Sequence, residues 1–290
     1  MEIIWQLFIQ GVILSMVYLL IASGFNIIYS TTGHFHIAHA GIFTIAGYFL
    51  YLLIESMGFP VWLSSIFAIV LASLAGVLVY LFIYTPVLSR NGTHLVLFIA
   101  SLGLLTVIDN GIVVLFSPDP QVFSVVNELN RTIMILGAPV TIIQIAMIVL
   151  GLVALASLYM VMNRTKVGMM IKSVSVNPDL SQIVGISLKK IHVICYAIGS
   201  ALVAIPGLYF AMDAGASSGK GVELVILAVM AVIMGGIRSL GGTWMTAIFI
   251  GMFYNLSILW IPPHWQTSII FFLFLIVIMV RPTGLVGQRA

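Results

Sequence analysis

Residues 94–116 of the chain read HLVLFIASLGLLTVIDNGIVVLF, and this stretch decides the fold. It carries a single charged residue, Asp109, among side chains that are almost all apolar. A helix that crosses a lipid bilayer needs about 20 consecutive, mostly apolar residues. The stretch therefore predicts a transmembrane helix rather than a helix from the core of a soluble protein.

Stretches of the same kind follow one another along the chain. Of the 290 residues, 62% are hydrophobic and 7% are charged, whereas a soluble domain carries about 25% charged residues. We expect an all-α, polytopic bundle of transmembrane helices that forms a single integral-membrane domain over residues 1–290. The eight or nine candidate spans are Ile3–Tyr29, His36–Ile54, Pro60–Tyr84, His94–Phe116, Val140–Met162, Ile191–Met212, Val222–Ile237, Thr243–Trp260 and Trp265–Val280.

The span Val222–Ile237 is the shortest candidate. It ends in Gly235-Gly236, and Gly241-Gly242 follows closely. Because backbone polar groups in lipid must be satisfied internally, a short helix interrupted by glycine can mark a broken or re-entrant element that lines a cavity. A tight turn between two ordinary spans explains the same pattern. Both interpretations of residues 235–242 stay open at this point.

Basic residues predict the orientation. The longest polar stretch between spans is residues 163–190, and cytoplasmic loops carry an excess of Lys and Arg. With nine spans, a cytoplasmic loop 163–190 also places the C-terminus in the cytoplasm and the N-terminus outside. Nine of the eleven Lys and Arg residues then lie inside: Arg90, Arg164, Lys166, Lys172, Lys189, Lys190, Arg238, Arg281 and Arg289.

The loop 163–190 contains the signals of a short helix within Asn177–Ile186. Asn177 can cap the helix, and Pro178 suits its first position. Asp179 places a negative charge near the positive helix end, and Gly185 can end the helix in a left-handed conformation. The apolar residues Leu180, Ile183 and Val184 share one face. Since a helix this short is not stable alone in water, it packs either on its own bundle or on a cytoplasmic partner.

Polar residues inside apolar spans are the candidates for a translocation pathway. Asp109, which Asn110 follows, is the acid deepest within a span. Ionisable residues within a membrane usually face the bundle interior or an aqueous cavity, so Asp109 either binds a substrate ammonium group or bonds to a neighbouring helix. Asn26 either lies on the pathway or bridges helices by hydrogen bonds. Gly235 and Gly236 belong to the pathway only if their segment is re-entrant.

Evidence for catalysis is missing from the sequence. Residues 215–221 resemble a phosphate-binding loop, but Ala214 stands where the first glycine is needed and Gly221 where Ser or Thr would hold Mg²⁺. His34, His36 and His39 are close in sequence without an acid or cysteine beside them, so we expect no metal site. An ion-driven secondary transporter remains an alternative, and so does an intramembrane enzyme.

Five motifs resemble the LivH/LivM-type permeases of bacterial ABC importers for branched-chain amino acids, most closely the LivH side. They span most of the chain and follow the family's order. Four of them depart in places: His36 replaces an Asn, Thr85 an Arg, Ala40 and Arg238 each a Gly, and residues 172–176 a segment with alanine and glutamate. The fifth, Arg281–Gly287, closely matches the family's C-terminal signature. The motifs lie at 24–41 around Ile37-Ala38-His39, at Tyr84-Thr85-Pro86, at 168–186, at 235–241 and at Arg281–Gly287.

The resemblance implies a type II-like ABC importer permease. Such a subunit would pair with a second homologous permease, bind two ATP-binding subunits and receive its substrate from a periplasmic binding protein. It would lie in the bacterial inner membrane among lipid, have no nucleic-acid partner and need no cofactor, because its partners use the ATP and Mg²⁺. The segment Asn177–Ile186 would be its coupling helix, and His39 would serve packing or gating. A permease for urea or short amides is the alternative within this architecture, because related permeases resemble one another more than their substrates do.

Overall fold

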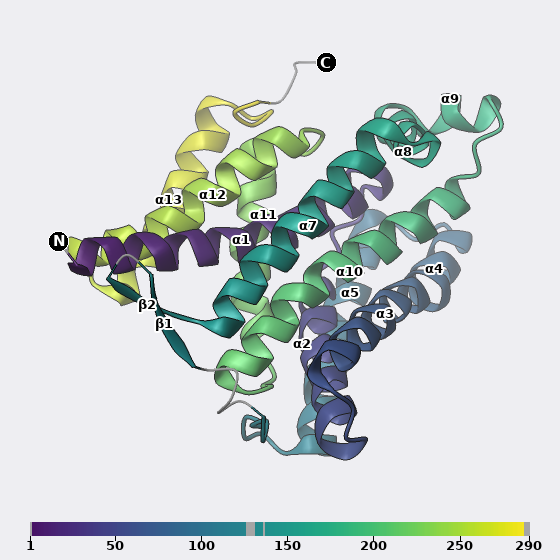
Figure 1. The fold of residues 1–290 in the computed structure, drawn as a ribbon. Helices are drawn as coiled ribbons and strands as arrows, with labels where there is room; N and C mark the ends of the chain where they lie inside the picture. The colour runs from purple at the N-terminus through teal and green to yellow at the C-terminus, as the bar shows by residue number, and fades with distance from the viewer. Residues whose placement is uncertain (1, 126–130, 136, 287–290) are drawn as a thin grey trace.

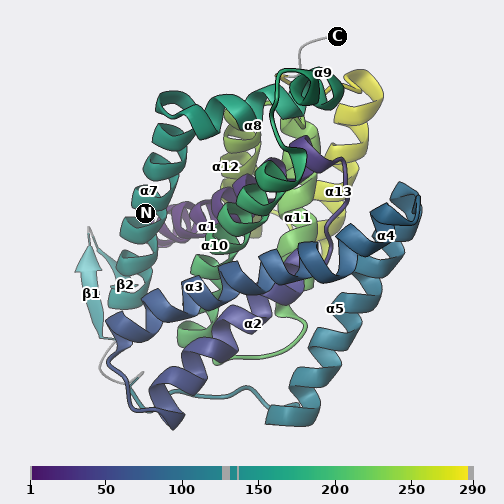
Figure 2. The same ribbon diagram turned by 90° about the vertical axis from the view of Figure 1, so that its right-hand side faces the viewer.

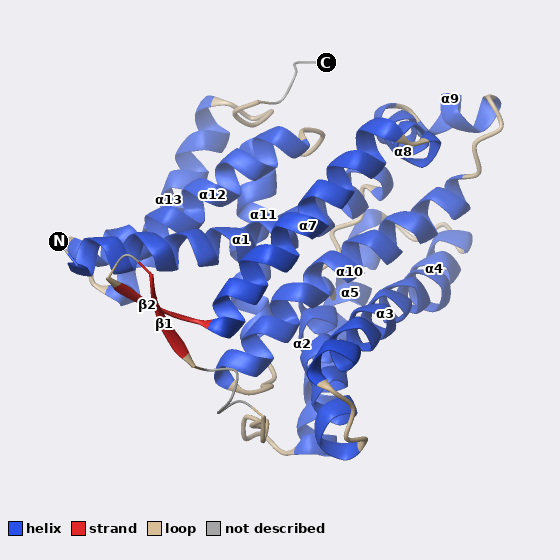
Figure 3. Ribbon diagram, viewed as in Figure 1, coloured by secondary structure: helices blue, strands red, loops and turns tan. Residues whose placement is uncertain are grey.

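The computed structural model describes residues 2–125, 131–135 and 137–286, and most of them are helical (Figure 3). Within these residues, eight helices are long and apolar enough to cross a membrane. The expected all-α bundle is confirmed. The helices are α1 (Glu2–Thr32), α2 (His39–Tyr51), α3 (Val61–Val79), α4 (Thr85–Ser89), α5 (His94–Phe116), α7 (Ile142–Arg164), α8 (Lys166–Val176), α9 (Pro178–Ile183), α10 (Leu188–Ala214), α11 (Lys220–Gly235), α12 (Leu240–Leu256) and α13 (Pro263–Val280).

Three helices are extended by short segments of different winding. The π-helix η1 (Leu52–Ser56) continues α2, and the π-helix η2 (Tyr80–Tyr84) joins α3 to α4. The 3₁₀ segment η3 (Ser257–Leu259) extends α12. With these extensions, the spans run over His39–Ser56, Val61–Ser89 and Leu240–Leu259. The sequence located all three spans, but it gave no signal for the change of winding.

Helix α1 forms the centre of the bundle (Figures 1 and 2). It contacts α10, α11 and α12 along its length, and 89% of its most apolar window is buried, against 11% for α13. Helices α5 and α3 are also largely exposed. The exposed apolar faces of these outer helices are what a helix presents to lipid or to another membrane subunit.

Small residues let the helices of the core approach closely. A Cβ atom added to Gly24 on α1 would lie 2.6 Å from the carbonyl oxygen of Gly199 on α10. An added Cβ at Gly207 would meet the backbone of Phe43 on α2, and one at Gly76 would meet the side chain of Ser200. Glycines at membrane helix crossings serve this purpose, so Gly24, Gly76 and Gly207 set the spacing between helices in the core.

Two elements of the structure are absent from the sequence-based expectations. The polar stretch 163–190 holds α8 in addition to α9. Before α7, the antiparallel strands β1 (Thr132–Ile135) and β2 (Ala138–Thr141) form a hairpin in which Thr132 pairs with Thr141 and Ile135 with Ala138. Because α7 runs from β2 to α8, the hairpin and the α8–α9 pair lie at opposite ends of the bundle (Figure 1).

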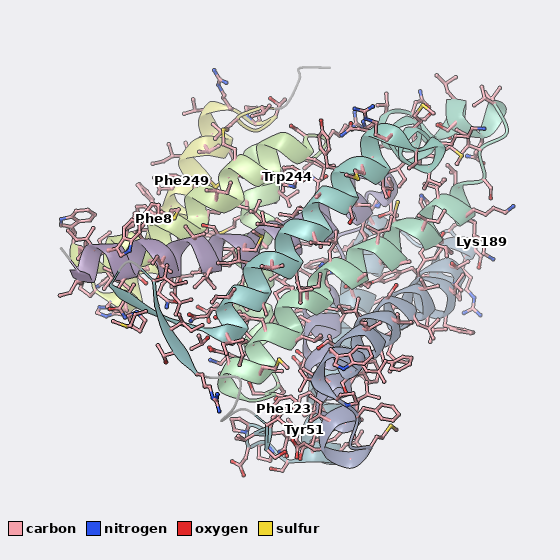
Figure 4. All side chains as sticks on the ribbon, viewed as in Figure 1. Phe8, Tyr51, Phe123, Lys189, Trp244 and Phe249 are labelled. Atoms are coloured by element: carbon pink, nitrogen blue, oxygen red, sulfur yellow. The ribbon has the colours of Figure 1, made fainter. Side chains whose placement is uncertain are left out.

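The distribution of basic residues follows these two ends. The α4–α5 connection, the α7–α10 connection, the α11–α12 turn and the end of α13 lie toward the end that carries α9 (Figures 1 and 2). Among the labelled side chains, Lys189 lies toward this end and Tyr51 and Phe123 toward the other (Figure 4). Arg289 and Gly287 lie outside the described residues. Toward the α9 end lie Arg90, Arg164, Lys166, Lys172, Lys189, Lys190, Arg238 and Arg281.

Candidate functional site

The short helix expected within Asn177–Ile186 is present as α9, and its ends have the predicted chemistry. The Asn177 side chain accepts a hydrogen bond of 3.0 Å from the backbone N–H of Leu180. Pro178 occupies the first turn together with Asp179. Beyond the helix, Gly185 has φ of +87°, a value that glycine adopts without steric cost. The sequence therefore located this helix and both of its ends.

The apolar face of α9 does not pack on the rest of the chain. Leu180, Ile183 and Val184 are 60%, 79% and 73% exposed. The sequence left two alternatives for this helix, packing on its own bundle or on a cytoplasmic partner. Among the described residues, these three side chains do not pack on the bundle. A contiguous, exposed apolar face on a polar segment is typical of a surface that another protein covers.

Helix α8 holds α9 in place. The hydroxyl groups of Ser173 on α8 and Ser181 on α9 lie 2.9 Å apart, and Ser181 is 1% exposed. Helix α8 itself packs on the bundle through Gly168, Ile171 and Val174, which are buried. Their spacing of three residues, together with the cap at Thr165, is a helix signal that sequence analysis could have used.

Asp109 and Asn110 lie next to each other on α5 but point to different surroundings. Asn110 is exposed, and its side-chain amide donates to the carbonyl of Thr106 on the same helix at 2.8 Å. Asp109 is half-buried; the Tyr48 ring and the backbone N–H of Gly219, just before α11, lie near its carboxylate. The carboxylate therefore sits between α2, α5 and the loop that precedes α11.

Besides Asn110, the exposed face of α5 carries one further polar side chain, Thr106, and a glycine, Gly103. Gly103, Thr106 and Asn110 follow one another at helical spacing, and all three are exposed. An added Cβ at Gly103 or Gly111 would meet no atom within 4 Å. Thr106 and Asn110 satisfy their side-chain donors on their own helix, through the carbonyls of Leu102 and Thr106. Exposed apolar residues such as Val107 and Val114 lie on the same helix.

Asn26 bridges helices. Its side-chain amide donates to the carbonyl of Ile237 at 2.8 Å and to the hydroxyl of Thr243 at 2.9 Å, and the residue is 2% exposed. Both donor positions of the amide thus tie α1 to Ile237, in the turn between α11 and α12, and to Thr243 on α12. This geometry matches the bridging interpretation of Asn26.

Gly235 and Gly236 form a tight turn rather than a re-entrant loop. Gly236 has φ of +104°, and an added Cβ at Gly235 would lie 2.4 Å from the backbone of Gly242 on α12. The C-terminal segment packs against the turn, because the N–H of Leu285 donates a hydrogen bond of 2.7 Å to the carbonyl of Met234. Helix α11 is short, with 16 residues, but it is mostly buried among other helices. The turn interpretation is therefore the one that the structure favours.

The three sequence-adjacent histidines are buried in the protein. His34 is 4% exposed, and His36 and His39 are 0% exposed. Among the described residues, no three His, Cys, Asp or Glu side chains are arranged to hold a metal ion. His36 instead pairs with the hydroxyl of Tyr84 at 2.7 Å, and His39 lies edge-on to the ring of Phe25.

Comparison with known proteins assigns this architecture to a family. The sequence model described as "Branched-chain amino acid transport system / permease component" matches residues 7–279. BraD of Pseudomonas aeruginosa, a high-affinity branched-chain amino acid transport system permease protein, is 24% identical over 98% of this chain and 95% of its own length. The permease protein LivH of Escherichia coli K12 is 25% identical over the same shares of the two chains.

Two further similarities come from outside this group. The fructose import permease protein FruF of Bifidobacterium longum is 30% identical over 79% of this chain and 62% of its own length. The solved structure described as PsaBC from Streptococcus pneumoniae in complex with Fab superimposes with a TM-score of 0.54 at 12% identity. That alignment covers 94% of this chain and 91% of the other. At this identity the structural likeness concerns the fold alone.

Proposed function

The chain belongs to the family of branched-chain amino acid transport permeases, and from this premise we propose that it is the membrane-spanning permease subunit of a bacterial ABC importer. It lies in the inner membrane as a multi-pass protein, pairs with a second permease subunit and binds two ATP-binding subunits. A periplasmic binding protein delivers the substrate. ATP and Mg²⁺ act on the partner subunits, and this chain contributes half of the translocation pathway.

The observation that carries this proposal is the exposed apolar face of α9. Leu180, Ile183 and Val184 form an apolar surface on a helix that is capped at Asn177 and anchored by Ser181. A helix laid into an apolar groove of a partner is a recurring mode of protein recognition. An ATP-binding subunit that closes on ATP would displace α9, and the permease would switch between its outward-open and inward-open arrangements. Such a switch requires a partner with different affinity for the two arrangements.

The distribution of charge supports a cytoplasmic position for α9. Among the described residues, eight Lys and Arg side chains lie toward the α9 end, while Arg131 and Lys220 belong to the opposite end. Loops rich in Lys and Arg stay on the cytoplasmic side during membrane insertion. The loop 163–190 and the C-terminal segment therefore face the cytoplasm, where the ATP-binding subunits are.

The surroundings of Asp109 favour a substrate with an ammonium group. A half-buried carboxylate offers a counter-charge to a cation within the membrane. Branched-chain amino acids and other small amino acids carry such a group, and the family relatives are named for them. A sugar is the second candidate, because FruF is 30% identical over much of this chain. A sugar has no cation for Asp109 to bind.

The test is ATP-driven uptake by the assembled transporter. The permease is reconstituted into liposomes with its partner permease, its ATP-binding subunits and its binding protein, and the import of leucine, valine and fructose is measured in parallel. We expect import of leucine or valine that requires ATP. ATP-driven import of fructose alone would favour the sugar. Uptake by this chain alone under an ion gradient would contradict the proposal and favour a secondary transporter.

A further inference from the structure

An apolar groove opens at the end of the bundle opposite α9. It lies between the N-terminal half of α1, the β1–β2 hairpin and the start of α7 (Figure 1). Its volume is about 280 Å³, and the described residues that line it present only apolar atoms. The lining includes Ile9, Val12, Ile135, Val140, Ile145 and Val149.

The two helices that wall the groove are already in contact beside it. The side-chain amide of Gln144 on α7 donates a hydrogen bond of 3.4 Å to the side-chain carbonyl of Gln10 on α1. Two turns further along α7, a Cβ atom added to Gly151 would lie 2.6 Å from the side chain of Met16. Helices α1 and α7 therefore cannot move together to close the groove, and whatever surrounds the bundle must fill it.

The groove faces the hydrocarbon of the membrane. Val12, Ile135 and Val149 are 36%, 37% and 53% exposed, so the groove is open at the surface of the bundle. On the spanning helix α7, Ile145 and Val149 lie about 5 and 10 Å from the start of the helix, at 1.5 Å per residue. Water does not fill such a space, since apolar cavities of roughly 150 Å³ stay dry and take up apolar molecules. A hydrocarbon chain does fill it.

The hairpin marks the level of the lipid headgroups at this end. Among the described residues, β1 pairs with β2 alone, so its other edge leaves backbone N–H and C=O groups without a strand partner. Such groups are not left unsatisfied within hydrocarbon, so β1 lies where water and headgroups supply partners. Because α7 follows β2 directly, the groove continues from the headgroup level into the hydrocarbon.

Arg131 places a positive charge at the mouth of the groove. It directly precedes β1 and is exposed. The N–H of Ile142, the first residue of α7, donates a hydrogen bond of 3.3 Å to the carbonyl of Arg131. Ile145 in the groove lies one helical turn further into the membrane. A guanidinium group matches the geometry of a phosphate, so a phosphate at Arg131 would lie about one turn above the hydrocarbon site.

Trp5 extends the groove face of α1 toward the headgroups. It lies four residues before Ile9 and seven before Val12, so the three residues share one helix face. The indole N–H of Trp5 is buried without a partner among the described residues. Buried tryptophan N–H groups usually find an acceptor, and tryptophan prefers the membrane–water interface. The ester and phosphate oxygens of a lipid are acceptors at this level.

We propose that the groove is a binding site for one phospholipid, which places an acyl chain between α1, the hairpin and α7 and its phosphate on Arg131. The apolar lining selects hydrocarbon, the guanidinium group selects phosphate, and the spacing of one helical turn joins both in a single molecule. A side chain of another subunit would fill the groove without a use for the positive charge. The inference is independent of the role of α9, because it needs neither ATP nor a cytoplasmic partner.

The probe is phosphatidylglycerol with a photoreactive diazirine in one acyl chain. The full chain is purified in maltoside micelles, whose headgroups carry no phosphate, and irradiated with increasing mole fractions of the probe. Mass spectrometry then locates the labelled residues. We expect labels on α1, the hairpin and α7 at the groove. Val149→Trp, which fills the groove, should lose them. Val153→Trp, one turn along α7 at a position that is 59% exposed and outside the groove lining, is the matched control and should retain them.

The phosphate contact is tested separately. The mole fraction of the probe that gives half-maximal labelling should rise roughly fivefold in Arg131→Gln, as expected for one arginine at a membrane surface. Lys220→Gln, at the other exposed basic position of this end, should match the parent. A diacylglycerol with the same photoreactive chain and no phosphate should label the parent as weakly as phosphatidylglycerol labels Arg131→Gln.

Three results would overturn the inference. Groove labels that persist in Val149→Trp would mean that lipid only surrounds the bundle. Equal labelling by phosphatidylglycerol and diacylglycerol would exclude the phosphate contact. Labels that disappear once the partner permease is added would assign the groove to a subunit interface. If Val149→Trp does not fold, Arg131→Gln at its exposed position still decides. ATP-driven uptake enters none of these readouts, so the proposed function stands or falls separately.

Discussion

At the scale of single residues, the proposed function assigns the preference for an amino-acid cargo to Asp109. Its half-buried carboxylate lies beside Tyr48 and the loop before α11. Hydrogen bonds to a charged group contribute about 1.5–3 kcal/mol. Because about 1.4 kcal/mol corresponds to a tenfold change in affinity, Asp109→Asn should raise the KM for leucine uptake by a factor of about ten or more. Asp119→Asn, in the exposed segment after α5, is the control and should leave the KM unchanged. An unaltered KM in Asp109→Asn would exclude the carboxylate from the pathway.

A second residue-scale prediction concerns His34, which lies between the first two spans. Burial, and secondarily the nearby His192 and His94, lower the pKa of His34 to about 4. The unfolded chain binds the proton near the ordinary pKa of about 6.5. His34 therefore supports the fold fully above pH 6.5, and that support, up to about 3 kcal/mol, is lost as the pH falls from 6.5 to 4.

Thermal unfolding in detergent, followed from pH 8 to pH 4, checks this prediction for His34. The midpoint should fall below pH 6.5 in the parent protein and fall less in His34→Gln, which cannot take up a proton. His264→Gln, at an exposed position near the start of α13, should keep the full pH dependence. Identical pH profiles for the parent and His34→Gln would contradict the burial of a neutral imidazole.

At the scale of elements, α9 should be dispensable for folding and indispensable for coupling. Leu180 and Ile183 are 60% and 79% exposed, so Leu180→Asp and Ile183→Asp remove little packing against the described residues. We expect both variants to fold normally and to lose ATP-driven uptake, because an aspartate cannot enter an apolar groove without a large desolvation cost. Gln182→Asp adds the same charge at an exposed position beside them and should retain uptake. Normal uptake in Ile183→Asp would contradict the docking role.

The elements also show what sequence patterns can and cannot predict. The caps of α9 were readable because Asn177, Pro178 and Gly185 each satisfy a local requirement of the backbone. The spans were readable because lipid demands long apolar stretches. The π-helical winding of η2 was not predicted, since it depends on packing rather than on a local motif. The hairpin at Thr132–Thr141 was not predicted either, because its strands are four residues long and β1 is exposed at every residue, so it shows no alternation of apolar and polar side chains to recognise. The contacts of the His34 ring with Tyr84 and His94 were not predicted either, because they join segments that are distant in the sequence.

At the scale of the whole molecule, the close crossing of α1 and α10 holds the core together. An added Cβ at Gly199 would lie 2.7 Å from Ile28 and 2.8 Å from the carbonyl of Gly24. Gly199→Ala should therefore destabilise the fold by about 1–3 kcal/mol. Gly241→Ala, where an added Cβ meets no atom within 4 Å, should be neutral or stabilising, because alanine favours a helix. The thermal midpoints of the purified variants give the comparison, and equal midpoints would contradict the crossing.

The central claim for the whole molecule is that α9 receives force from a separate ATP-binding subunit in the cytoplasm. The most direct measurement places a photo-crosslinking amino acid at Ile183 in the assembled transporter and identifies the crosslinked chain by mass spectrometry. The account predicts a crosslink to the ATP-binding subunit that disappears when that subunit is removed. Crosslinks from Ile183 only to lipid or to this chain would contradict the account. Labelling of this position by reagents added from the periplasmic side would contradict it as well.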